Sequence, residues 1–426
     1  MIDNSHVKHI EIEQLAIYLA KKLVSYPSIT PDDAGSFDFL YNYLTSLGFN
    51  CREVTQQGVR NLIATQYFGE GETFAFAGHL DVVPTGPEHL WRCSPFSGEI
   101  IDECLYGRGI ADMKGAIACF IAAIESLLTR CSRGTLMLLI TCDEEGEAEY
   151  GTASLMQYLR SKEPEKIPDY CLVGEPSCKT TLGDTIKIGR RGALSGHIRV
   201  LGRQGHVAYP DNCENAAHYA VTIADKLLTI NWDKGTKQMP GTSLQITQLS
   251  SGEFVDNIVP GITDIHFNIR YSSLYSEQHL KTIIDETLQL PHINIEIDWQ
   301  RPCEPYFNSA TDFVGIVSRA ILKTVGIIPM LTTDGGTSDG RFIASDKTQV
   351  IEFGVKNETI HQVNEHVPLT DLYNLTQIYQ VTIAAFCCQD SNHTSTINKK
   401  NISRNLQDIE NASQQLDEVL ECIEYS

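Results

Sequence analysis

Short apolar runs alternate with helix-like segments over the first half of the chain. Apolar residues recur at helical spacing over Glu11–Ser25 and Met113–Thr129, whereas Thr73–Ala77, Thr135–Thr141 and Tyr170–Val173 are short apolar runs typical of buried strands. This alternation indicates an α/β domain. Open α/β sheets bind ligands beyond the carboxyl ends of their strands, so we expect site residues in the segments that follow these runs.

The pattern changes between about Gly192 and Glu304. This part reads strand, helix, strand, strand, helix, strand, with helices expected over Asn215–Ile230 and Glu277–Leu290. That order is typical of a split β-α-β, ferredoxin-like α+β domain. Because strand and helix alternation resumes after it, we predict a discontinuous α/β domain, residues 1–191 and 305–388, with the α+β domain, residues 192–304, inserted into it.

The end of the chain has a different composition. Residues 389–405 are rich in Ser, Asn, Thr and Lys, which predicts a polar linker. Apolar residues then recur at helical spacing over residues 406–423, which predicts an amphipathic helix within the segment 389–426. We expect this helix to dock on its own domain, and a partner-binding helix is the alternative.

Length and charge narrow the class of protein. A chain of 426 residues exceeds what one hydrophobic core usually supports, in agreement with two domains. No apolar stretch reaches about eighteen residues and the N-terminus is polar, so we expect a cytoplasmic protein that does not enter a membrane. A net charge of -21 argues against a nucleic-acid partner, and it means that an anionic substrate must meet a local cluster of Arg.

The cysteines do not form a disulfide or zinc-ribbon pattern. Their number, thirteen, is odd, no CxxC pair occurs, and Cys387 and Cys388 are adjacent. We therefore expect reduced thiols.

Polar residues with metal-binding chemistry follow several of the expected strands. His79 and Asp81 of GHLDVVP lie two residues apart, so both side chains point to one face if the strand continues. A carboxylate beside a metal-bound imidazole commonly fixes its orientation. Asp112 of GRGIADMKG follows two glycines and precedes an apolar helix, where it could bridge two cations or cap the helix.

Two further motifs carry acids. In TCDEEGE, three acids follow a buried strand, which is costly unless cations compensate their repulsion; one of Glu144 and Glu145 would then bind metal while the other accepts a proton. A solvated acidic loop is the alternative. Glu175 of VGEP also follows an apolar strand, and His361 of TIHQVNE lies in the second part of the α/β domain. Two His and three carboxylates suit Zn²⁺, Co²⁺ or Mn²⁺.

The order of these motifs resembles the co-catalytic zinc aminoacylase and carboxypeptidase family. The resemblance covers about residues 11–386. It rests on GHLDVVPTG, WRCSPFSGEIIDECLYGRGIADMKG, DEEGEAEYGT, LVGEP, KIGRRGALSG, GHVAYP, DNIVPG, GGTSDGRFIA and TIHQVNEHV.

The resemblance implies a role for each residue. Two divalent ions, zinc or alternatively cobalt, would be bridged by Asp112, followed by a non-proline cis peptide, Asp112–Met113. His79 and Glu175 would complete one site, and Glu145 and His361 the other. Glu144 would be the general base and Asp81 the partner of His79.

The inserted domain would then be a lid and dimerisation domain of a homodimer. His206 of GHVAYP would reach into the partner's active site and stabilise the oxyanion. Arg190 and Arg270 would bind carboxylates of the substrate. Tyr209, Asn257, Gly336, Thr337 and Asn357 would assist. Arg offers a bidentate fork to carboxylates, so the substrate is expected to carry a carboxylate-bearing acyl group. The adjacent Arg191 could take the place of Arg190.

The resemblance therefore implies metal-dependent amide hydrolysis of a small-molecule substrate. Another metallo-deacylase or carboxypeptidase of the same family, with the same metals and a different acyl pocket, is the nearest alternative. A non-catalytic relative that uses the pocket to bind ligands is an alternative of a different class.

Overall fold

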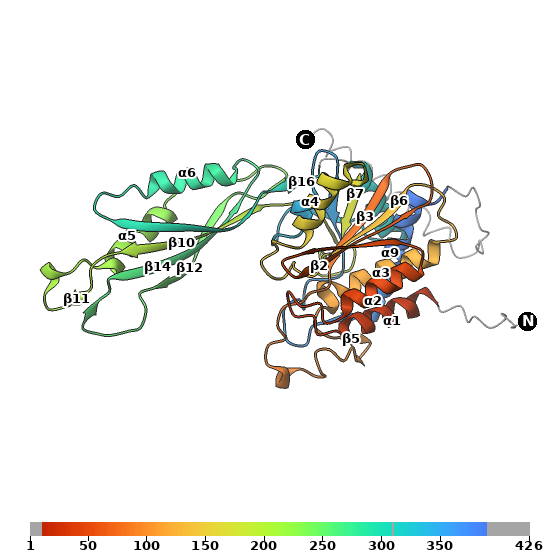
Figure 1. Ribbon diagram of the computed structural model, residues 1–426, viewed down its shortest axis with the longest axis horizontal. Helices are drawn as coiled ribbons and strands as arrows, with labels where there is room; N and C mark the ends of the chain where they lie inside the picture. Colours follow the sequence, from red (N-terminus) through yellow and green to blue (C-terminus); the bar gives the residue numbers. More distant parts are fainter. Residues whose placement is uncertain (1–10, 309–310, 390–426) are drawn as a thin grey trace, which may run out of the picture. The chain divides into compact units, whose positions relative to one another are not determined.

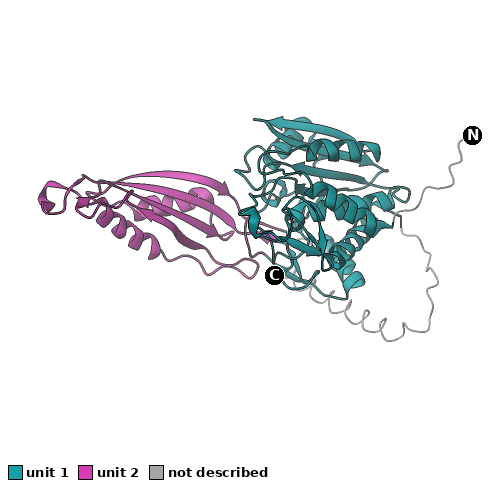
Figure 2. Cartoon of the chain, turned by 90° about the horizontal axis from the view of Figure 1, so that it is seen from below, with its two compact units in different colours: residues 1–188, 308–332, 338–426 teal, residues 189–307, 333–337 magenta. Residues whose placement is uncertain are grey.

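The computed structural model describes residues 11–308 and 311–389, which form two compact units (Figures 1 and 2). Unit 1 contains the described residues up to Ile188, those of Asn308–Thr332 and those from Ser338 onward, and unit 2 contains Gly189–Phe307 and Thr333–Thr337. The linker and helix predicted for residues 390–426 lie outside the described residues.

Unit 1 is built on a mixed eight-stranded sheet. Its strands, in spatial order, are β1 (Asn50–Gln56), β2 (Val59–Tyr67), β6 (Thr135–Thr141), β3 (Thr73–His79), β7 (Tyr170–Val173), β18 (Gln349–Glu352), β8 (Thr185–Lys187) and β17 (Met330–Thr332). The neighbouring strands β6, β3, β7 and β18 are parallel, so their carboxyl ends meet at one edge of the sheet. A small sheet of β4 (Ile100–Ile101), β5 (Cys104–Tyr106) and β19 (His366–Pro368) accompanies it.

The central strands of this sheet are apolar and buried on both faces. On one face Phe76 of β3 stacks on Phe120 at 4.1 Å between ring centroids and packs edge-on against Tyr379. On the other face Asn61 of β2 accepts a hydrogen bond from Thr141 and donates one to the carbonyl of Tyr150. Helices therefore cover both faces, as in α/β domains.

The helices of unit 1 occur between the strands. They are α1 (Ile12–Val24), α2 (Ser36–Ser46), α3 (Gly115–Leu127), α4 (Thr152–Lys162), α7 (Thr311–Val325), α8 (Gly340–Ile343) and α9 (Leu369–Cys387). α3 contacts α1 and α9 and is buried almost all round, which explains its nearly continuous apolar sequence. α4 packs against β1, β2 and β6.

Unit 2 has the split β-α-β order. Its antiparallel sheet runs β12 (Ser243–Ser250), β14 (Ile262–Tyr271), β10 (Gly192–Leu201) and β15 (Asn294–Cys303), with α5 (Ala216–Leu228) and α6 (Glu277–Thr287). The short pairs are β9 (Gly189–Arg190) with β16 (Tyr306–Phe307), and β11 (Gly205–His206) with β13 (Ile258–Val259). Ile198, Phe267, Ile223 and Ile284 belong to its buried core. The predicted fold class is confirmed.

Unit 2 is slightly larger than the inserted segment predicted from the sequence. Gly189 and Arg190 belong to it because β9 pairs with β16. The segment Thr333–Thr337 also belongs to it, since the Thr333 hydroxyl donates a hydrogen bond to the carbonyl of Gln238 at 2.7 Å. Such contacts between distant segments do not register in local sequence patterns.

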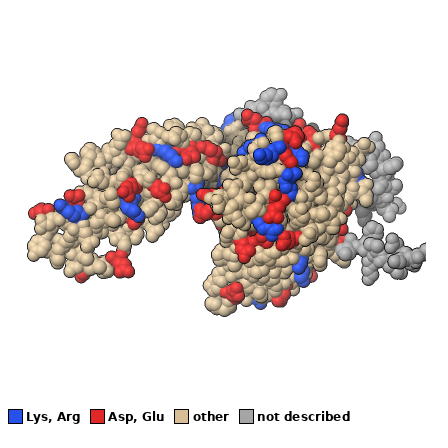
Figure 3. Space-filling model, in the orientation of Figure 1, with Lys and Arg blue, Asp and Glu red and all other residues tan. Residues whose placement is uncertain are grey.

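Two further features concern the whole described chain. No helix among the described residues is long and apolar enough to cross a membrane. On the face drawn in Figure 3, acidic side chains are interspersed with Lys and Arg over both units.

Candidate active site

Three neighbouring parallel strands deliver the first candidate ligands. β3 continues to His79, which lies opposite Thr141, the last residue of β6. Glu144 and Glu145 follow Thr141, and Glu175 follows the last residue of β7. Because β6, β3 and β7 lie side by side, their carboxyl ends bring these side chains to one edge of the sheet, where the sequence predicts them.

Asp112 reaches the same edge from a turn. Helix α3 begins at Gly115, not at Met113 as the pattern predicts, because Asp112 and Met113 have non-helical backbone angles. The peptide bond between them is cis, as the resemblance implies. Gly109 enters the turn with a φ of 84°, and a β-carbon there would lie 2.4 Å from Cγ1 of Val82, so this position requires glycine.

The five predicted ligands lie together in unit 1. Ligand atoms of His79, Asp112 and Glu145 lie within 4.8 Å of one another, as do those of His79, Glu144 and Glu175. Nε2 of His361 lies 3.1 Å from Oε1 of Glu145. Glu144 thus lies close enough to be a ligand itself, so its role depends on chemistry as well as position.

The two carboxylate oxygens of Asp112 point to different histidines. Oδ1 lies 3.1 Å from Nε2 of His79, whose Nε2 is also 3.6 Å from Oε1 of Glu175. Oδ2 lies 3.3 Å from Nε2 of His361. Asp112 therefore stands between two sets, each with one imidazole and one further carboxylate. A bridging carboxylate between two cations needs this arrangement.

Asp81 contacts His79 differently from the predicted carboxylate–imidazole pair. Nδ1 of His79 lies 2.9 Å from the backbone carbonyl of Asp81 and 3.7 Å from its carboxylate oxygen Oδ1. The buried carboxylate instead accepts hydrogen bonds from the amides of Glu144 at 3.1 Å and Glu145 at 3.0 Å. The Asp81 carboxylate therefore positions the acidic loop, while its carbonyl orients the imidazole.

The charges of the cluster shift the pKa values of its members. Burial, and then the neighbouring acids, raise the pKa of both Glu144 and Glu175 well above the usual range. Burial opposes the charge of His79, but its hydrogen bond to Asp112 and the charges of Glu144 and Glu175 outweigh burial and raise the pKa of His79. Crowded buried carboxylates favour bound cations, which compensate their repulsion.

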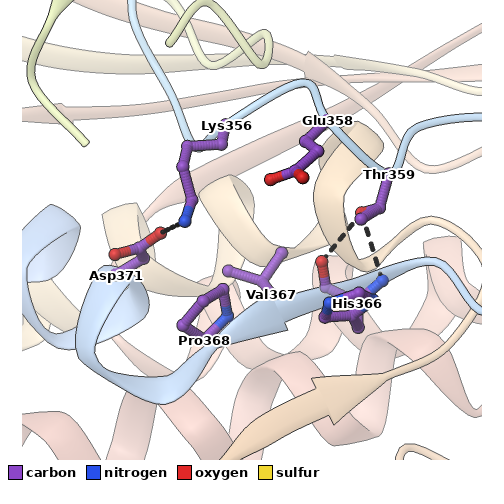
Figure 4. Close-up of a pocket in the computed structure, with 7 residues that line it drawn as sticks. All are labelled: Lys356, Glu358, Thr359, His366, Val367, Pro368 and Asp371. Atoms are coloured by element: carbon purple, nitrogen blue, oxygen red, sulfur yellow. Dashed lines mark hydrogen bonds and ion pairs between the residues drawn. The ribbon is translucent and has the colours of Figure 1, made fainter. Parts of the chain in front are cut away.

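The loop that carries His361 is held at its base (Figure 4). Nζ of Lys356 lies 3.3 Å from a carboxylate oxygen of Asp371 in α9. The Thr359 hydroxyl donates to the carbonyl of His366 at 2.8 Å and accepts from the amide of His366 at 3.2 Å. These contacts close the loop before and after His361, which has a φ of 60° and a half-exposed side chain.

Glu365 was not singled out from the sequence, yet it connects the segment that carries His361 to the turn that carries Asp112. Its buried Oε1 accepts hydrogen bonds from the amides of Ala111 at 2.8 Å and Asp112 at 3.2 Å. Oε2 accepts from the amide of Gly109 at 3.0 Å and from Nη1 of Arg108 at 2.7 Å. The carboxylate four residues after His361 therefore fixes the turn that presents Asp112.

The predicted substrate-binding residues are divided between the units. Asn357 belongs to unit 1, where its amide donates to the carbonyl of Cys178 at 2.9 Å. The others belong to unit 2 and are Arg190, Tyr209, Asn257, Arg270, Gly336 and Thr337. His206, predicted to stabilise the oxyanion, belongs to unit 2 as well. The ring centroids of His206 and Tyr209 are 5.7 Å apart, and the carbonyl of Asn257 accepts from the amide of Val207 at 3.1 Å.

The two adjacent arginines have different partners in unit 2. Nη1 of Arg190, which is buried, donates to the carbonyl of Asp334 at 3.0 Å, next to the segment that holds Gly336. Nη1 of Arg191 donates to the carbonyl of Gly241 at 3.1 Å. Arg190 is therefore the one associated with the Gly336 and Thr337 turn.

Comparison with known proteins agrees with this arrangement. The model of peptidase family M20/M25/M40 matches residues 75–385, which include all five candidate ligands. The chain belongs to this family. It is 46% identical over 371 residues to succinyl-diaminopimelate desuccinylase 1 of Alteromonas mediterranea, covering 85% of this chain and 94% of that protein. A relative from Halorhodospira halophila at 40% identity is also a succinyl-diaminopimelate desuccinylase.

Solved structures of the family share the fold. An M20 family metallo-carboxypeptidase from Sulfolobus solfataricus superposes with a TM-score of 0.76 at 17% identity, covering 87% of this chain and 99% of that chain. A dinuclear metal-binding peptidase of the family from Bacillus subtilis superposes with a TM-score of 0.62 at 14% identity, covering 88% and 98%. At these identities the likeness establishes the fold alone.

Proposed function

We propose that this protein is a metal-dependent amide hydrolase that removes succinate from N-succinyl-LL-2,6-diaminopimelate and releases LL-2,6-diaminopimelate, a precursor of lysine and peptidoglycan. The names of relatives at 40–46% identity support the substrate. The observation that carries the chemistry is the carboxylate of Asp112, which presents one oxygen to each of two histidine and carboxylate sets beside Glu144.

The donor set fits two divalent cations. His79 and Glu175 would hold one, His361 and Glu145 the other, and Asp112 would bridge them. Imidazole and carboxylate donors without thiolate suit Zn²⁺, with Co²⁺ as an alternative. Bound there, the ions supply a Lewis acid for the amide carbonyl and lower the pKa of a water molecule.

Glu144 is proposed as the general base and acid. Its burial among acids raises the pKa of its carboxyl, which favours acceptance of a proton by this group. It would accept the proton of the attacking water and then donate it to the leaving amine. Asp81, through the amides of Glu144 and Glu145, would hold the base in place.

Recognition of the substrate is assigned to the arginines and polar groups predicted from the sequence. Arg190 and Arg270 would bind carboxylates, since guanidinium groups match carboxylate geometry. Tyr209, Asn257, Gly336, Thr337 and Asn357 would assist.

A comparison of two N-acylated amino acids tests the substrate. Zinc-loaded protein is expected to hydrolyse N-succinyl-LL-2,6-diaminopimelate far faster than N-acetylornithine, because the acetyl group lacks the carboxylate that the arginines would bind. Removing metal with a chelator should abolish turnover, and adding Zn²⁺ back should restore it. Preference for the acetyl compound would overturn the substrate, and no turnover of either compound would favour a non-catalytic role.

A homodimer formed through unit 2 is part of the proposal. His206 is exposed, and apolar side chains near it are exposed as well, including Val207, Phe254, Val255 and Ile258. Phe254 is 91% exposed and lines a hollow of about 780 Å³ with Val255 and Ile258. Exposed apolar patches of this kind mark interaction surfaces. In a dimer formed there, His206 of one subunit would enter the active site of the other subunit and stabilise the oxyanion.

Mixed dimers test this sharing of sites. His206→Ala and Glu144→Gln homodimers are each expected to be nearly inactive, whereas a dimer with one subunit of each kind contains one intact site. Random exchange of subunits should therefore restore about a quarter of wild-type turnover. Isolated mixed dimers without any regained turnover would contradict the donation of His206 between subunits, and the unmixed variants serve as controls.

A further inference from the structure

Two cysteines face each other where the ends of α3 and α9 meet in unit 1. Cys131 and Cys388 form an isolated antiparallel bridge. The amide of Ser132 donates to the carbonyl of Cys387 at 2.8 Å. This pattern marks a pair whose own amides do not bond across the bridge, in which the Cα atoms lie about 4.5 Å apart. That separation falls inside the range of about 4.4–6.8 Å for disulfides.

The thiols of this pair lie near one another. Those of Cys387 and Cys388 both influence the pKa of Cys131. Cys131 is partly exposed, whereas Cys387 and Cys388 are buried. A reagent in solution would therefore meet Cys131 first, and a buried thiol would be at hand to react with it next.

The backbone around the pair is already fixed by other bonds. Nε of Arg133 donates to the carbonyl of Phe386 at 3.0 Å, and Nη2 donates to that of Ala385 at 2.6 Å. The amide of Cys388 donates to the carbonyl of Ala384 at 3.0 Å. These bonds hold the end of α9 against the connection between α3 and β6, so the two cysteines remain opposite each other.

The thiols are slow to react at neutral pH. The hydrogen bond to Cys387 and burial raise the pKa of Cys131, and burial raises the pKa of Cys388 to about 11. Arg130 opposes both shifts. Since the thiolate is the nucleophile, the pair remains reduced without an oxidant and reacts faster as the pH rises.

We propose that Cys131 and Cys388 form a reversible disulfide in the presence of a low-molecular-weight disulfide such as oxidised glutathione. The Cys131 thiolate attacks one sulfur of the oxidant, forms a mixed disulfide and releases one glutathione thiolate. The Cys388 thiolate then attacks the sulfur of Cys131 and releases the second. The two cysteines lose two protons and two electrons, and the oxidant becomes two thiols.

The crosslink would fasten the chain at the point where residues 389–426 begin. It lies shortly before Thr135, the first residue of β6, whereas the candidate ligands follow the opposite ends of the strands. Turnover is therefore expected to be the same with and without the crosslink. This inference does not depend on the proposed function.

The test uses the full-length protein incubated with oxidised glutathione at about pH 9, because the raised pKa values of both thiols leave little thiolate at neutral pH. The sample is quenched with an alkylating reagent, digested and analysed by mass spectrometry. We expect a linked pair of peptides containing Cys131 and Cys388, about 2 Da lighter than the two reduced peptides together. Dithiothreitol should separate them.

Three single variants assign the bond. Cys387→Ser should retain the link, which identifies Cys388 within the shared peptide, whereas Cys388→Ser should lose it and accumulate glutathione on Cys131. Cys93→Ser, which alters another partly exposed thiol of unit 1, should behave as the wild type. A link retained in Cys388→Ser and lost in Cys387→Ser would overturn the proposal, as would stable glutathione on Cys131 of the wild type without any link.

Discussion

Replacing Glu144 with Gln is expected to reduce turnover by roughly 10²–10⁴-fold, the usual worth of general acid–base catalysis. The side-chain amide of Gln has the size of the Glu carboxylate but no basic oxygen to accept the proton of water. The backbone N–H groups of residues 144 and 145 still donate to the Asp81 carboxylate, so the loop should remain in place. We therefore expect KM for the substrate to change much less than kcat.

The same variant separates a base from a ligand, which position alone does not do. Glu144 groups with His79 and Glu175 within 4.8 Å, so it could contribute to a metal site. If Glu144 is the base, the Glu144→Gln variant is expected to retain two metal ions per subunit, measured by atomic absorption after dialysis. Loss of one ion would make Glu144 a ligand, and undiminished kcat would remove both roles. Glu149→Gln, an exposed acid on the same loop, is the matched control.

The site residues at the strand ends could be predicted because short apolar runs in the sequence identify the strands that carry them. Thr73–His79, Thr135–Thr141 and Tyr170–Val173 are apolar enough to be buried, and parallel strands that neighbour one another end at a common edge. A polar residue at the end of such a strand, or just beyond it, therefore lies at that edge of the sheet. This reasoning locates His79 and Glu175 without knowledge of the tertiary structure.

The turn at Asp112 was less accessible to the same reasoning. The apolar pattern continues through Met113, so periodicity places the helix start there, whereas the non-helical backbone angles of Asp112 and Met113 delay it to Gly115. Only the resemblance to a family suggested the cis bond. Asp81 shows a related limit, because spacing indicates which face a side chain occupies and not which of its oxygens bonds to His79.

Glu365 shows what sequence patterns omit altogether. It pairs with Arg108 from 257 positions away, and both side chains are buried. Each lies four residues from a candidate ligand, Arg108 before Asp112 and Glu365 after His361, but neither motif shows that the two side chains pair. Long-range pairing of charged groups depends on the folded chain, so it emerges only with the structure.

Removing the carboxylate of Glu365 should therefore weaken metal binding although Glu365 is not a ligand. Glu365→Ala leaves the amides of Ala111 and Asp112 without their acceptor, so the turn that presents Asp112 loses its fixed orientation. Partners of this kind typically contribute about 10–100-fold to metal affinity or activity. We expect that loss in zinc affinity, measured by competition with a chelating indicator, together with a changed absorption spectrum of the Co²⁺-loaded protein.

Folding must be measured beside metal binding. Arg108 would remain buried without its partner, and breaking a buried ion pair costs about 3–5 kcal/mol. Thermal unfolding of the metal-free protein reports that cost separately. Glu365→Gln retains one oxygen acceptor and should recover part of the zinc affinity. Glu358→Gln, on the same loop but exposed, should match the wild type. If Glu365→Ala is destabilised yet binds zinc as tightly as the wild type, Glu365 supports the fold and does not position Asp112.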